Sequence, residues 1–402
     1  MRKGRIDILK KIWRIEDAMD LVKKHITISD KSVLTPLTEL VGSIIGEDVY
    51  APCPVPHFRR STMDGYAVVA ADTHGASESL PAMLHLSDSK LPMCERVYTG
   101  DLVREAFDAV MMLEYAEELL DGTVLLSRPI AAGDNIMGVG EDIAANSLAL
   151  GQGGQATSHD VGVLAALGKT GVKTRDFRVG IISTGNEIVP YECLPQVGQM
   201  RDINSPLLTS LFQTAGFRVQ YYGIFRDDEV SLTKALAMAL EQTDAVVLSG
   251  GSSAGALDFT ERAVNNLGLP GVLVHGLAVK PGKPTILGAV RGRLVVGLPG
   301  HPLSCAVMAH MVALPLLRFA AGAKASMPMY ASVVLARPLA SLPGRRDFIP
   351  CRLSGQEAWP QQSKSAAIQV LAASQGLLVV PEECEGYSAG TTVNVRLWGG
   401  SV

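Results

Sequence analysis

The sequence predicts a multidomain α/β protein: a doubly wound, mostly parallel α/β domain, mixed α/β domains before it and a small β-barrel-like domain after it. The chain has 402 residues, enough for several domains at about 150 residues each. Between residues 178 and 320, short β-branched runs alternate with helical segments, as in a parallel sheet covered on both faces. On either side of that stretch, short strands separated by turn residues dominate.

Composition excludes several classes of protein. Hydrophobic residues make up 47% of the chain and charged residues 19%, which excludes a disordered chain. A net charge of −4 gives no overall attraction for nucleic acid or membrane lipid. The longest apolar stretch, 306–317, contains His310 and Pro315 and is shorter than the roughly 18 residues of a membrane span, and no secretory signal is visible. We therefore expect a cytoplasmic protein without membrane or nucleic-acid partners, and six widely spaced cysteines predict no structural zinc.

The N-terminal third combines one helix with short strands. Apolar residues at helical spacing predict an amphipathic helix at its start: Ile15, Ala18, Met19, Val22 and Ile26. Segments 109–115 and 123–130 flank a polar turn and are predicted to pair as strands. A second helix is predicted to begin near Ser158 and to stop at Gly168.

The central section alternates strand and helix. Strands are predicted at 178–182, 218–224 and 244–249, with further strands through Val274 and Val296. Helices are predicted from Asn204, as N-cap, to Gly216, then at 229–243, from about 259 and from about 302. The last 75 or so residues are predicted to be all β, with strands at 331–336, 348–353, 367–372, 377–380 and 392–397.

Three loops rich in glycine or hydroxyl groups follow predicted strands of the central sheet. They are STGNE (183–187), SGGSSAG (249–255) and LPGHP (298–302). Ligands of open α/β sheets bind at the carboxyl ends of the strands, and glycine loops before helices present N–H groups to anions. Each loop alone is equally a tight turn; together they predict a pocket for a phosphorylated, ring-bearing ligand. The candidate binding residues are Thr184, Gly185, Ser249, Gly250, Gly251, Ser252, Pro299 and Gly300.

Other nucleotide-site motifs are missing from the sequence. It contains no G-x-x-x-x-G-K-[ST], which argues against a Walker-type NTPase, and no early G-x-G-x-x-G, which argues against a dinucleotide dehydrogenase.

Charged residues complement these loops. KPGKP (280–284) holds Lys280 and Lys283 on a stiff turn, and its place between two glycine loops favours anion binding over a solvated surface loop. Carboxylates beside bound phosphate are typical of Mg²⁺ sites, although an acid of this kind taken alone is more often a helix cap, turn former or solvated charge. The acidic candidates are Asp64, Asp142, Glu187, Asp227, Asp228 and Asp258.

Taken in order, these motifs resemble the molybdopterin molybdenumtransferase family, which includes the C-terminal domain of gephyrin. The motifs that carry the resemblance are STMDGYAV (61–68), GEDI (140–143), STGNEIV (183–189), DINSPLL (202–208), LSGGSSAG (248–255), KPGKP (280–284) and GLPGHPLS (297–304). The resemblance implies an enzyme of molybdenum cofactor biosynthesis that inserts molybdate into adenylylated molybdopterin, with Mg²⁺, and releases AMP.

The resemblance also assigns roles to residues. It implies catalytic roles for Asp64, Asp142, Lys280 and Lys283. It implies that Asp258, with Glu187 or Asp228, holds Mg²⁺. Ser363 and Ser374 are expected to bind substrate, with Arg345 and Arg346 on the far side of the site.

The four-domain plan of that family implies boundaries and partners. Residues 1–50 and 141–176 would form a dimerisation domain, 51–140 an inserted β-rich domain, 177–322 the molybdopterin-binding domain and 323–402 the β domain. The resemblance implies a homodimer in which Asp64 and Asp142 reach the site of the other subunit. Molybdopterin adenylyltransferase and molybdoenzymes are the implied protein partners.

Two other functions stay open on the sequence. A dimeric molybdopterin-binding scaffold could keep the fold without turnover; the retained lysines and acids favour an enzyme. A molybdopterin adenylyltransferase would share only the α/β domain, and the additional domains argue against it. GGSSAG and PGHP depart from the more usual GGVSVG and PGNP, which bears on fine specificity.

Overall fold

The computed structural model describes residues 12–86, 90–250, 254–325, 327–361 and 364–398. The chain divides into two compact units. The first unit comprises residues 1–47, 152–158 and 171–402, and the second comprises 48–151 and 159–170.

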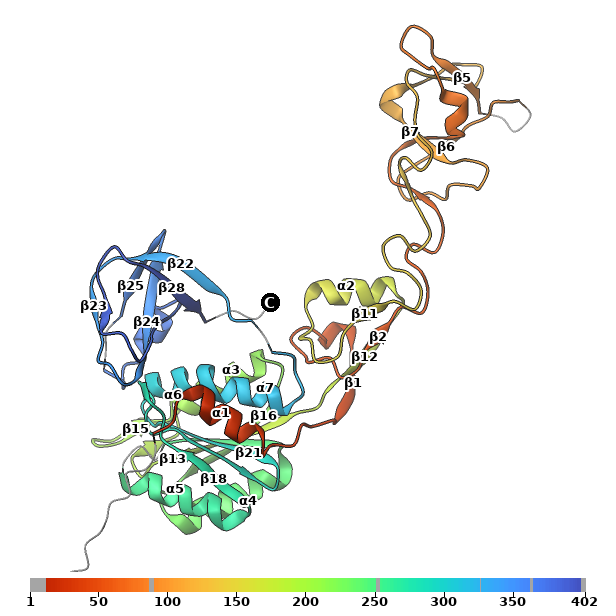
Figure 1. Cartoon of the computed structure of the whole chain (residues 1–402). Helices are drawn as coiled ribbons and strands as arrows, with labels where there is room; N and C mark the ends of the chain where they lie inside the picture. Colours follow the sequence, from red (N-terminus) through yellow and green to blue (C-terminus); the bar gives the residue numbers. More distant parts are fainter. Residues whose placement is uncertain (1–11, 87–89, 251–253, 326, 362–363, 399–402) are drawn as a thin grey trace, which may run out of the picture. The chain divides into compact units, whose positions relative to one another are not determined.

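The centre of the first unit is a six-stranded sheet with the order β16-β13-β17-β21-β20-β18 (Figure 1). Four strands are parallel, and the last two run antiparallel to their neighbours. The predicted doubly wound, mostly parallel domain is therefore confirmed. Its strands are β13 (Arg178–Thr184), β16 (Arg218–Phe225), β17 (Ala245–Ser249), β18 (Pro270–His275), β20 (Ile286–Val290) and β21 (Arg293–Leu298).

Helices cover both faces of this sheet because alternate residues of each buried strand point to opposite sides. In β17, Val247 packs on one face and Val246 on the other. Helices α1, α3, α6 and α7 cover the first face, and α4 and α5 cover the second (Figure 1). Their bounds are α1 (Ile15–Lys23), α3 (Asn204–Thr214), α4 (Glu229–Gln242), α5 (Ala254–Leu267), α6 (Pro302–Met308) and α7 (Leu314–Ala320).

Helices α6 and α7 form one continuous helical stretch joined by a π-helical turn, η4 (Ala309–Ala313). Within the described residues this stretch, Pro302–Ala320, is the single helix whose length and composition would suffice to cross a membrane. However, 72% of its most apolar window is buried inside the protein. Such burial is typical of the core helix of a folded domain.

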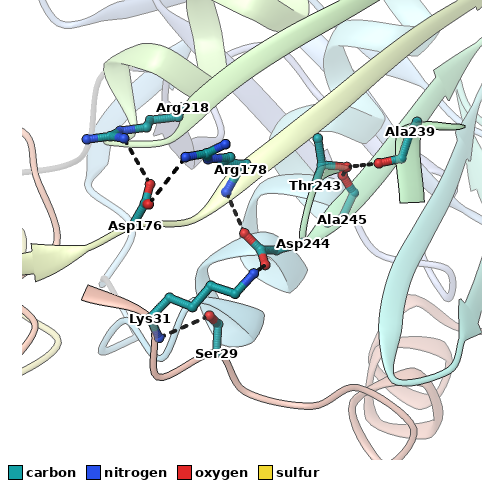
Figure 2. A network of polar contacts seen from close by, with 9 residues as sticks. All are labelled: Ser29, Lys31, Asp176, Arg178, Arg218, Ala239, Thr243, Asp244 and Ala245. Carbon is teal, nitrogen blue, oxygen red and sulfur yellow. Dashed lines mark hydrogen bonds and ion pairs between the residues drawn. The ribbon is translucent and has the colours of Figure 1, made fainter. Parts of the chain in front are cut away.

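The amino ends of the parallel strands are tied together by ion pairs (Figure 2). Asp244 pairs with Lys31 at 2.7 Å and accepts a 2.9 Å hydrogen bond from the Arg178 N–H group. Asp176 pairs with Arg218 at 3.2 Å and with Arg178 at 3.6 Å. The charges on this edge of the sheet are thus matched by other residues of the chain.

The C-terminal part of the first unit is a closed five-stranded barrel with the ring β24-β25-β22-β28-β26, in which β26 pairs back to β24. A short strand of the α/β region, β19, adds to β24 from outside. The strands are β19 (Val279–Lys280), β22 (Tyr330–Leu335), β24 (Arg346–Ser354), β25 (Glu357–Pro360), β26 (Gly376–Val380) and β28 (Thr392–Leu397). The remaining elements are β1 (Ser32–Pro36), η1 (Leu37–Glu39), β12 (Gly171–Arg175), β14 (Ile188–Val189), β15 (Met200–Arg201), β23 (Leu339–Ala340), α8 (Gln369–Ala372) and β27 (Gly386–Tyr387).

The second unit contains two three-stranded sheets, β6-β4-β7 and β5-β9-β8, and the pairs β2-β11 and β3-β10. Its strands are β2 (Val49–Tyr50), β3 (Arg60–Ser61), β4 (Gly65–Val68), β5 (Ala82–His85), β6 (Glu95–Val97), β7 (Ala109–Met112), β8 (Ala116–Glu118), β9 (Thr123–Leu126), β10 (Ile136–Met137) and β11 (Leu148–Leu150). Its helices are η2 (Ala70–Thr73), η3 (Leu113–Tyr115) and α2 (Ser158–Ala166), which begins at the boundary of the unit.

Three local predictions were wrong. Strands β7 and β9 do not pair with each other, because β8 intervenes and β9 pairs with β5 and β8 while β7 pairs with β4. The predicted strand 367–372 contains helix α8, since a short apolar run is compatible with either structure. Asn204 does not cap α3; the Asp202 carboxylate accepts from the Ser205 N–H group instead, at 3.1 Å.

Candidate functional site

The three predicted loops start side by side at the carboxyl edge of the sheet. Strand register pairs Ser183 of β13 with Ser249 of β17, and Ser249 with Leu298 of β21. The Gly250 N–H group donates to the Leu298 carbonyl oxygen at 3.3 Å. The edge that the sequence predicted to bind a ligand is therefore built from the ends of three neighbouring strands.

Glycine at position 250 is required by a close approach between two of these loops. Its φ is +128°, and a Cβ atom there would lie 2.1 Å from the Thr184 carbonyl oxygen. No L side chain avoids that overlap, because the obstacle is backbone. Gly250 thus lets the β17 loop close onto Thr184. Gly251 and Ser252, the next two predicted binding residues, lie outside the described residues.

A buried carboxylate that the sequence analysis did not select organises this edge. Asp202 accepts hydrogen bonds from Ser183 Oγ at 2.6 Å and from the Tyr221 hydroxyl at 2.8 Å, besides the Ser205 N–H group. Burial and the hydrogen bond to Asp202 raise the pKa of Tyr221 to about 12. Asp202 therefore fixes β13, β16 and α3 relative to one another. Its position in the motif DINSPLL was the available signal.

Asn204 joins α3 to the loop after β21. Its Nδ2 atom donates to the Gly300 carbonyl oxygen at 2.9 Å, and its Oδ1 atom is buried with no hydrogen-bond partner among the described residues. Buried polar atoms are nearly always satisfied, by protein or by ligand and water. Asn204 therefore positions the Gly300 loop and keeps one acceptor available.

The acids at this edge have two different roles. Asp228 is the N-cap of α4 and accepts from the Ser231 N–H group at 2.8 Å. Its neighbour Asp227 is half-buried, and its Oδ1 atom is buried with no hydrogen-bond partner among the described residues. Burial, with a smaller contribution from the charge of Glu187, raises the pKa of Asp227, while a hydrogen bond from Thr184 opposes the shift. Asp227 therefore interacts with Glu187, which follows β13. The sequence had suggested Asp228 or Glu187 as the partner of Asp258, but Asp228 caps α4.

These acids suit a cation held by few protein ligands. The described residues contain no group of three or more His, Cys, Asp or Glu placed to hold a metal. Mg²⁺ is commonly bound by one or two carboxylates together with substrate phosphates and water. The orphan oxygen of Asp227, beside Glu187, fits that pattern. The side chain of Asp258, in the first turns of α5, lies outside the described residues.

A basic pocket lies beside the same edge. Its volume is about 840 Å³, and it is lined by the loop that carries KPGKP, the loop after β21 and strand β24 of the barrel. Its charged lining residues are Lys280, Lys283, Arg345, Asp347 and Lys364. Pro299, predicted to bind substrate, also lines it. The two lysines therefore line one pocket together with the loop that follows β21.

Pairing between β19 and β24 sets the charge arrangement in this pocket. Their register places Lys280 beside Asp347, whose carboxylate is buried and accepts from Ser341 Oγ at 2.9 Å. Asp347 lies 4.0 Å from Lys280 Nζ and 3.4 Å from Arg345 Nε. Both are ion pairs, but the Lys280 side chain is 61% exposed, so its ammonium group remains accessible to an anion.

The turn between the two lysines is held by packing. At Gly282 φ is +117°, and a Cβ atom would lie 2.4 Å from Met308 of α6. The Leu277 N–H group donates to the Lys283 carbonyl oxygen at 2.9 Å. The lysine loop is therefore fixed against the core helix.

The barrel contributes one serine that was not predicted. Ser365 Oγ lies 2.8 Å from His301 Nδ1, and both side chains line the basic pocket. Ser374, which was predicted, does not line it: its hydroxyl accepts from Trp398 Nε1 at 3.1 Å and donates to the Leu371 carbonyl oxygen. Ser363 lies outside the described residues.

The two predicted arginines have separate environments. Arg345 lines the basic pocket. Arg346 points to the other side of β24, where it pairs with Glu382 at 3.1 Å and with Glu16 of α1. Arg346 therefore joins the barrel to α1, and the structure does not place it in the pocket.

A second cavity, of about 920 Å³, opens beside the end of β13. Gly185, Asp202 and Tyr221 line it, together with Asn186 and Arg226. Of the predicted residues, Lys280, Lys283 and Pro299 thus line the basic pocket and Gly185 lines the second cavity, whereas Thr184, Ser249, Gly250 and Gly300 line neither.

The remaining acids belong to the second unit. Asp64 is exposed and accepts from the Thr99 N–H group at 2.7 Å and from Thr99 Oγ1 at 2.9 Å. These bonds lower the pKa of Asp64, so the group stays ionised near neutral pH. Asp142 is also exposed, and its N–H group donates to the Val55 carbonyl oxygen. Both carboxylates are accessible within their unit.

Comparisons with known proteins agree with this architecture. Three family models match the chain: "MoeA N-terminal region (domain I and II)" at residues 13–168, "Probable molybdopterin binding domain" at 180–318 and "MoeA C-terminal region (domain IV)" at 332–398. The middle match contains the three strand-end loops and both lysines of KPGKP.

Relatives and a solved structure extend over nearly the whole chain. The chain is 32% identical to a molybdopterin molybdenumtransferase of Haemophilus influenzae, covering 90% of this chain and 92% of the relative. It is also 32% identical to molybdopterin molybdenumtransferase 2 of Mycobacterium tuberculosis, covering 91% and 95%. The crystal structure of a molybdopterin biosynthesis MoeA protein from Pyrococcus horikoshii superposes with a TM-score of 0.79 at 34% identity, covering 97% of this chain and all of that one. The chain therefore belongs to the MoeA family of molybdopterin molybdenumtransferases.

Proposed function

We propose that this protein inserts molybdate into adenylylated molybdopterin in a Mg²⁺-dependent reaction that releases AMP. The observation that carries the proposal is the basic pocket at the carboxyl edge of the sheet. The interacting carboxylates Asp227 and Glu187 follow strands β16 and β13 at the same edge. Both proposed substrates are anions, one a pyrophosphate and the other an oxyanion. The family relationship supports molybdenum transfer to molybdopterin as the general reaction.

The lysines would balance the negative charge of these substrates. Lys280 and Lys283 present ammonium groups from a rigid turn, and Arg345 adds a planar guanidinium from the barrel. In this proposal they hold molybdate and the pyrophosphate close together and offset the negative charge between them. Ser365 and His301 supply further polar contacts on the same wall.

The chemistry at the phosphate end is hydrolysis. A water oxygen attacks the adenylate phosphorus, the anhydride P–O bond breaks, and AMP leaves while the pterin keeps its own phosphate. Mg²⁺ would supply charge neutralisation on the phosphate oxygens. Asp227 and Glu187 are the described residues that would hold it, and Asp258 remains an expected third ligand. Asp228, which caps α4, has a structural role in this proposal.

The assembly is also part of the proposal. We propose a cytoplasmic homodimer in which Asp64 and Asp142 reach the active site of the partner subunit. Their exposure within the second unit supports this role, because a carboxylate already buried by its own chain could not serve another. Molybdopterin adenylyltransferase would supply the substrate, and molybdoenzymes would accept the product.

The test is a direct assay of AMP release. Purified protein is incubated with adenylylated molybdopterin, molybdate and Mg²⁺, and AMP is quantified by chromatography; parallel reactions lack one component each. We expect AMP only in the complete reaction, with molybdenum bound to the pterin product. Absence of AMP above background in the complete reaction would contradict the proposal and favour the molybdopterin-binding scaffold.

A further inference from the structure

A separate cavity of about 270 Å³ lies between α1, the helix pair α6–α7 and the last strand of the barrel. It shares no lining residue with the basic pocket. Its walls combine apolar side chains with four basic ones, and no acidic side chain lines it. The basic residues are Lys23, His310, Arg318 and Arg396, and the main apolar residues are Met311, Leu314, Pro315, Phe319, Leu397 and Trp398.

Arg318 is the most unusual of these residues. It is only 8% exposed, and its Nη1 atom donates to Gln155 Oε1 at 2.9 Å. Its Nε atom is buried without a hydrogen-bond partner, and no carboxylate among the described residues forms an ion pair with it. A buried guanidinium without a counterion is costly, and proteins normally pair such a charge.

Arg396, from the barrel, also lines the cavity. It projects from β28 and is partly buried, and no described carboxylate forms an ion pair with it either. Burial lowers the pKa of both arginines, although guanidinium groups stay charged at neutral pH. Lys23, by contrast, already pairs with Asp20 at 3.1 Å. Two unpaired guanidinium groups therefore face one cavity.

The rest of the wall is suited to an apolar body. The His310 ring lies 4.8 Å from the Trp398 ring, centroid to centroid. Burial and the charge of Arg396 lower the pKa of His310 to about 4, so its ring is neutral at physiological pH. Pockets for small organic ligands typically combine such apolar walls with a few polar anchors.

We infer that this cavity binds a small organic carboxylate, whose carboxyl group pairs with Arg318 and Arg396 and whose apolar body packs against Trp398 and the helix pair. A guanidinium matches a carboxylate through charge and parallel hydrogen bonds, and neither Arg318 nor Arg396 has a carboxylate partner among the described residues. The apolar wall disfavours a free phosphate, which would leave its remaining oxygens unpaired. The site is distinct from the proposed active site and does not depend on the proposed reaction.

The experiment measures binding to the full chain by calorimetry. The probes are benzoate, indole-3-acetate and 4-methylvalerate, each beside its neutral amide, with inorganic phosphate as a further control. We expect at least one carboxylate to bind with a dissociation constant below about 1 mM, and at least about tenfold more tightly than its amide and than phosphate. If no carboxylate binds more tightly than its amide, the inference is wrong. If phosphate binds best, the ligand class is wrong.

Two variants locate the binding. Arg396→Gln should weaken carboxylate binding at least about tenfold. Arg352→Gln, on an exposed position of the same barrel, should leave it unchanged. Unchanged binding in Arg396→Gln would overturn the inference. Should that variant fail to fold, Arg318→Met replaces the buried charge with an apolar chain of similar length; it should fold and should lose discrimination between acid and amide. Retained discrimination would equally overturn the inference.

Discussion

The two edges of the central sheet use similar residues in opposite ways. At the amino edge, Asp244 pairs with Lys31 and Asp176 pairs with two arginines (Figure 2). At the carboxyl edge, an oxygen of Asp227 is buried without a hydrogen-bond partner among the described residues, and Lys280 stands 4.0 Å from its nearest acid. Pairing within the chain stabilises the fold, whereas incompletely paired groups held in place are ready for a ligand.

The largest expected effect is at the carboxyl edge. Replacing Lys280 or Lys283 with Gln should lower kcat/KM for AMP release about 100-fold, because an anionic substrate loses a charged partner. The melting temperature should stay within about 1 °C, since the Lys280 side chain is 61% exposed. Lys234→Gln, on an exposed position of α4, is the matched control. Wild-type kinetics in both pocket variants would remove the lysines from the site.

At the amino edge, a substitution should lower stability and leave activity unchanged. Asp244→Ala removes an ion pair and leaves the Arg178 N–H group without its acceptor, so the free energy of unfolding should fall by about 1–3 kcal/mol. Urea denaturation measures this loss. AMP release at 25 °C should be unchanged, because Asp244 precedes β17 and the strand-end loop follows it, about 16 Å away along five strand residues. A loss of activity in the folded variant would show that the two edges are coupled.

Two neighbouring acids give a sharper test. Asp227→Asn should abolish Mg²⁺-dependent AMP release, whereas Asp228→Asn should retain it and lose a few tenths of a kcal/mol or more from the α4 cap. Equal loss of turnover in both variants would contradict the assignment of Asp227.

The same Asp227→Asn variant should show a pH-dependent gain in stability. The folded-state pKa of Asp227 is raised above 3.8, so the folded protein binds this proton more tightly than the unfolded chain does. The wild type therefore loses stability as pH rises above about 4, and Asn, which mimics the protonated form, does not. Urea denaturation should show that the variant has a higher free energy of unfolding than the wild type at pH 8 but not at pH 4. A larger stabilisation at pH 4 would mean that the pKa of Asp227 is lowered on folding.

The smallest expected effect is that of ionic strength, which should change substrate binding at the carboxyl edge more than ion pairing at the amino edge. Raising ionic strength from 0.1 to 1 M shortens the Debye length from about 10 to about 3 Å. The KM for molybdate should then rise a few-fold, because the exposed lysines act on an incoming anion through solvent. The contribution of the Lys31–Asp244 pair, obtained from a double-mutant cycle, should change by less than about 0.5 kcal/mol, since the Asp244 side chain is only 9% exposed and salt screens partly buried pairs weakly. An unchanged KM would argue against an electrostatic role for the pocket.

Much of the fold follows from local sequence patterns. Strand and helix alternate from residue 178 onward with apolar residues at matching periods, and the predicted helix over 229–243 is α4 almost to the residue. The strand-end loops could likewise be predicted, because the end of a parallel strand fixes which edge its loop joins. The errors arose where a short apolar run allows either structure, as at 367–372, or where the pairing partner is distant, as for β7 and β9.

By itself, the sequence determined the class of fold, the edge of the sheet where three loops meet and the charge on those loops, because periodicity and turn chemistry act over a few residues. Only the tertiary structure decided which charged side chains are left without a full set of partners, namely Asp227 and not Asp228, and the cavity arginines Arg318 and Arg396. It also decided that Ser365 and not Ser374 lines the basic pocket. Burial and pairing depend on contacts between segments far apart in the chain, such as β19 with β24. The same residue types are present in either case, and packing alone distinguishes a helix cap from a ligand.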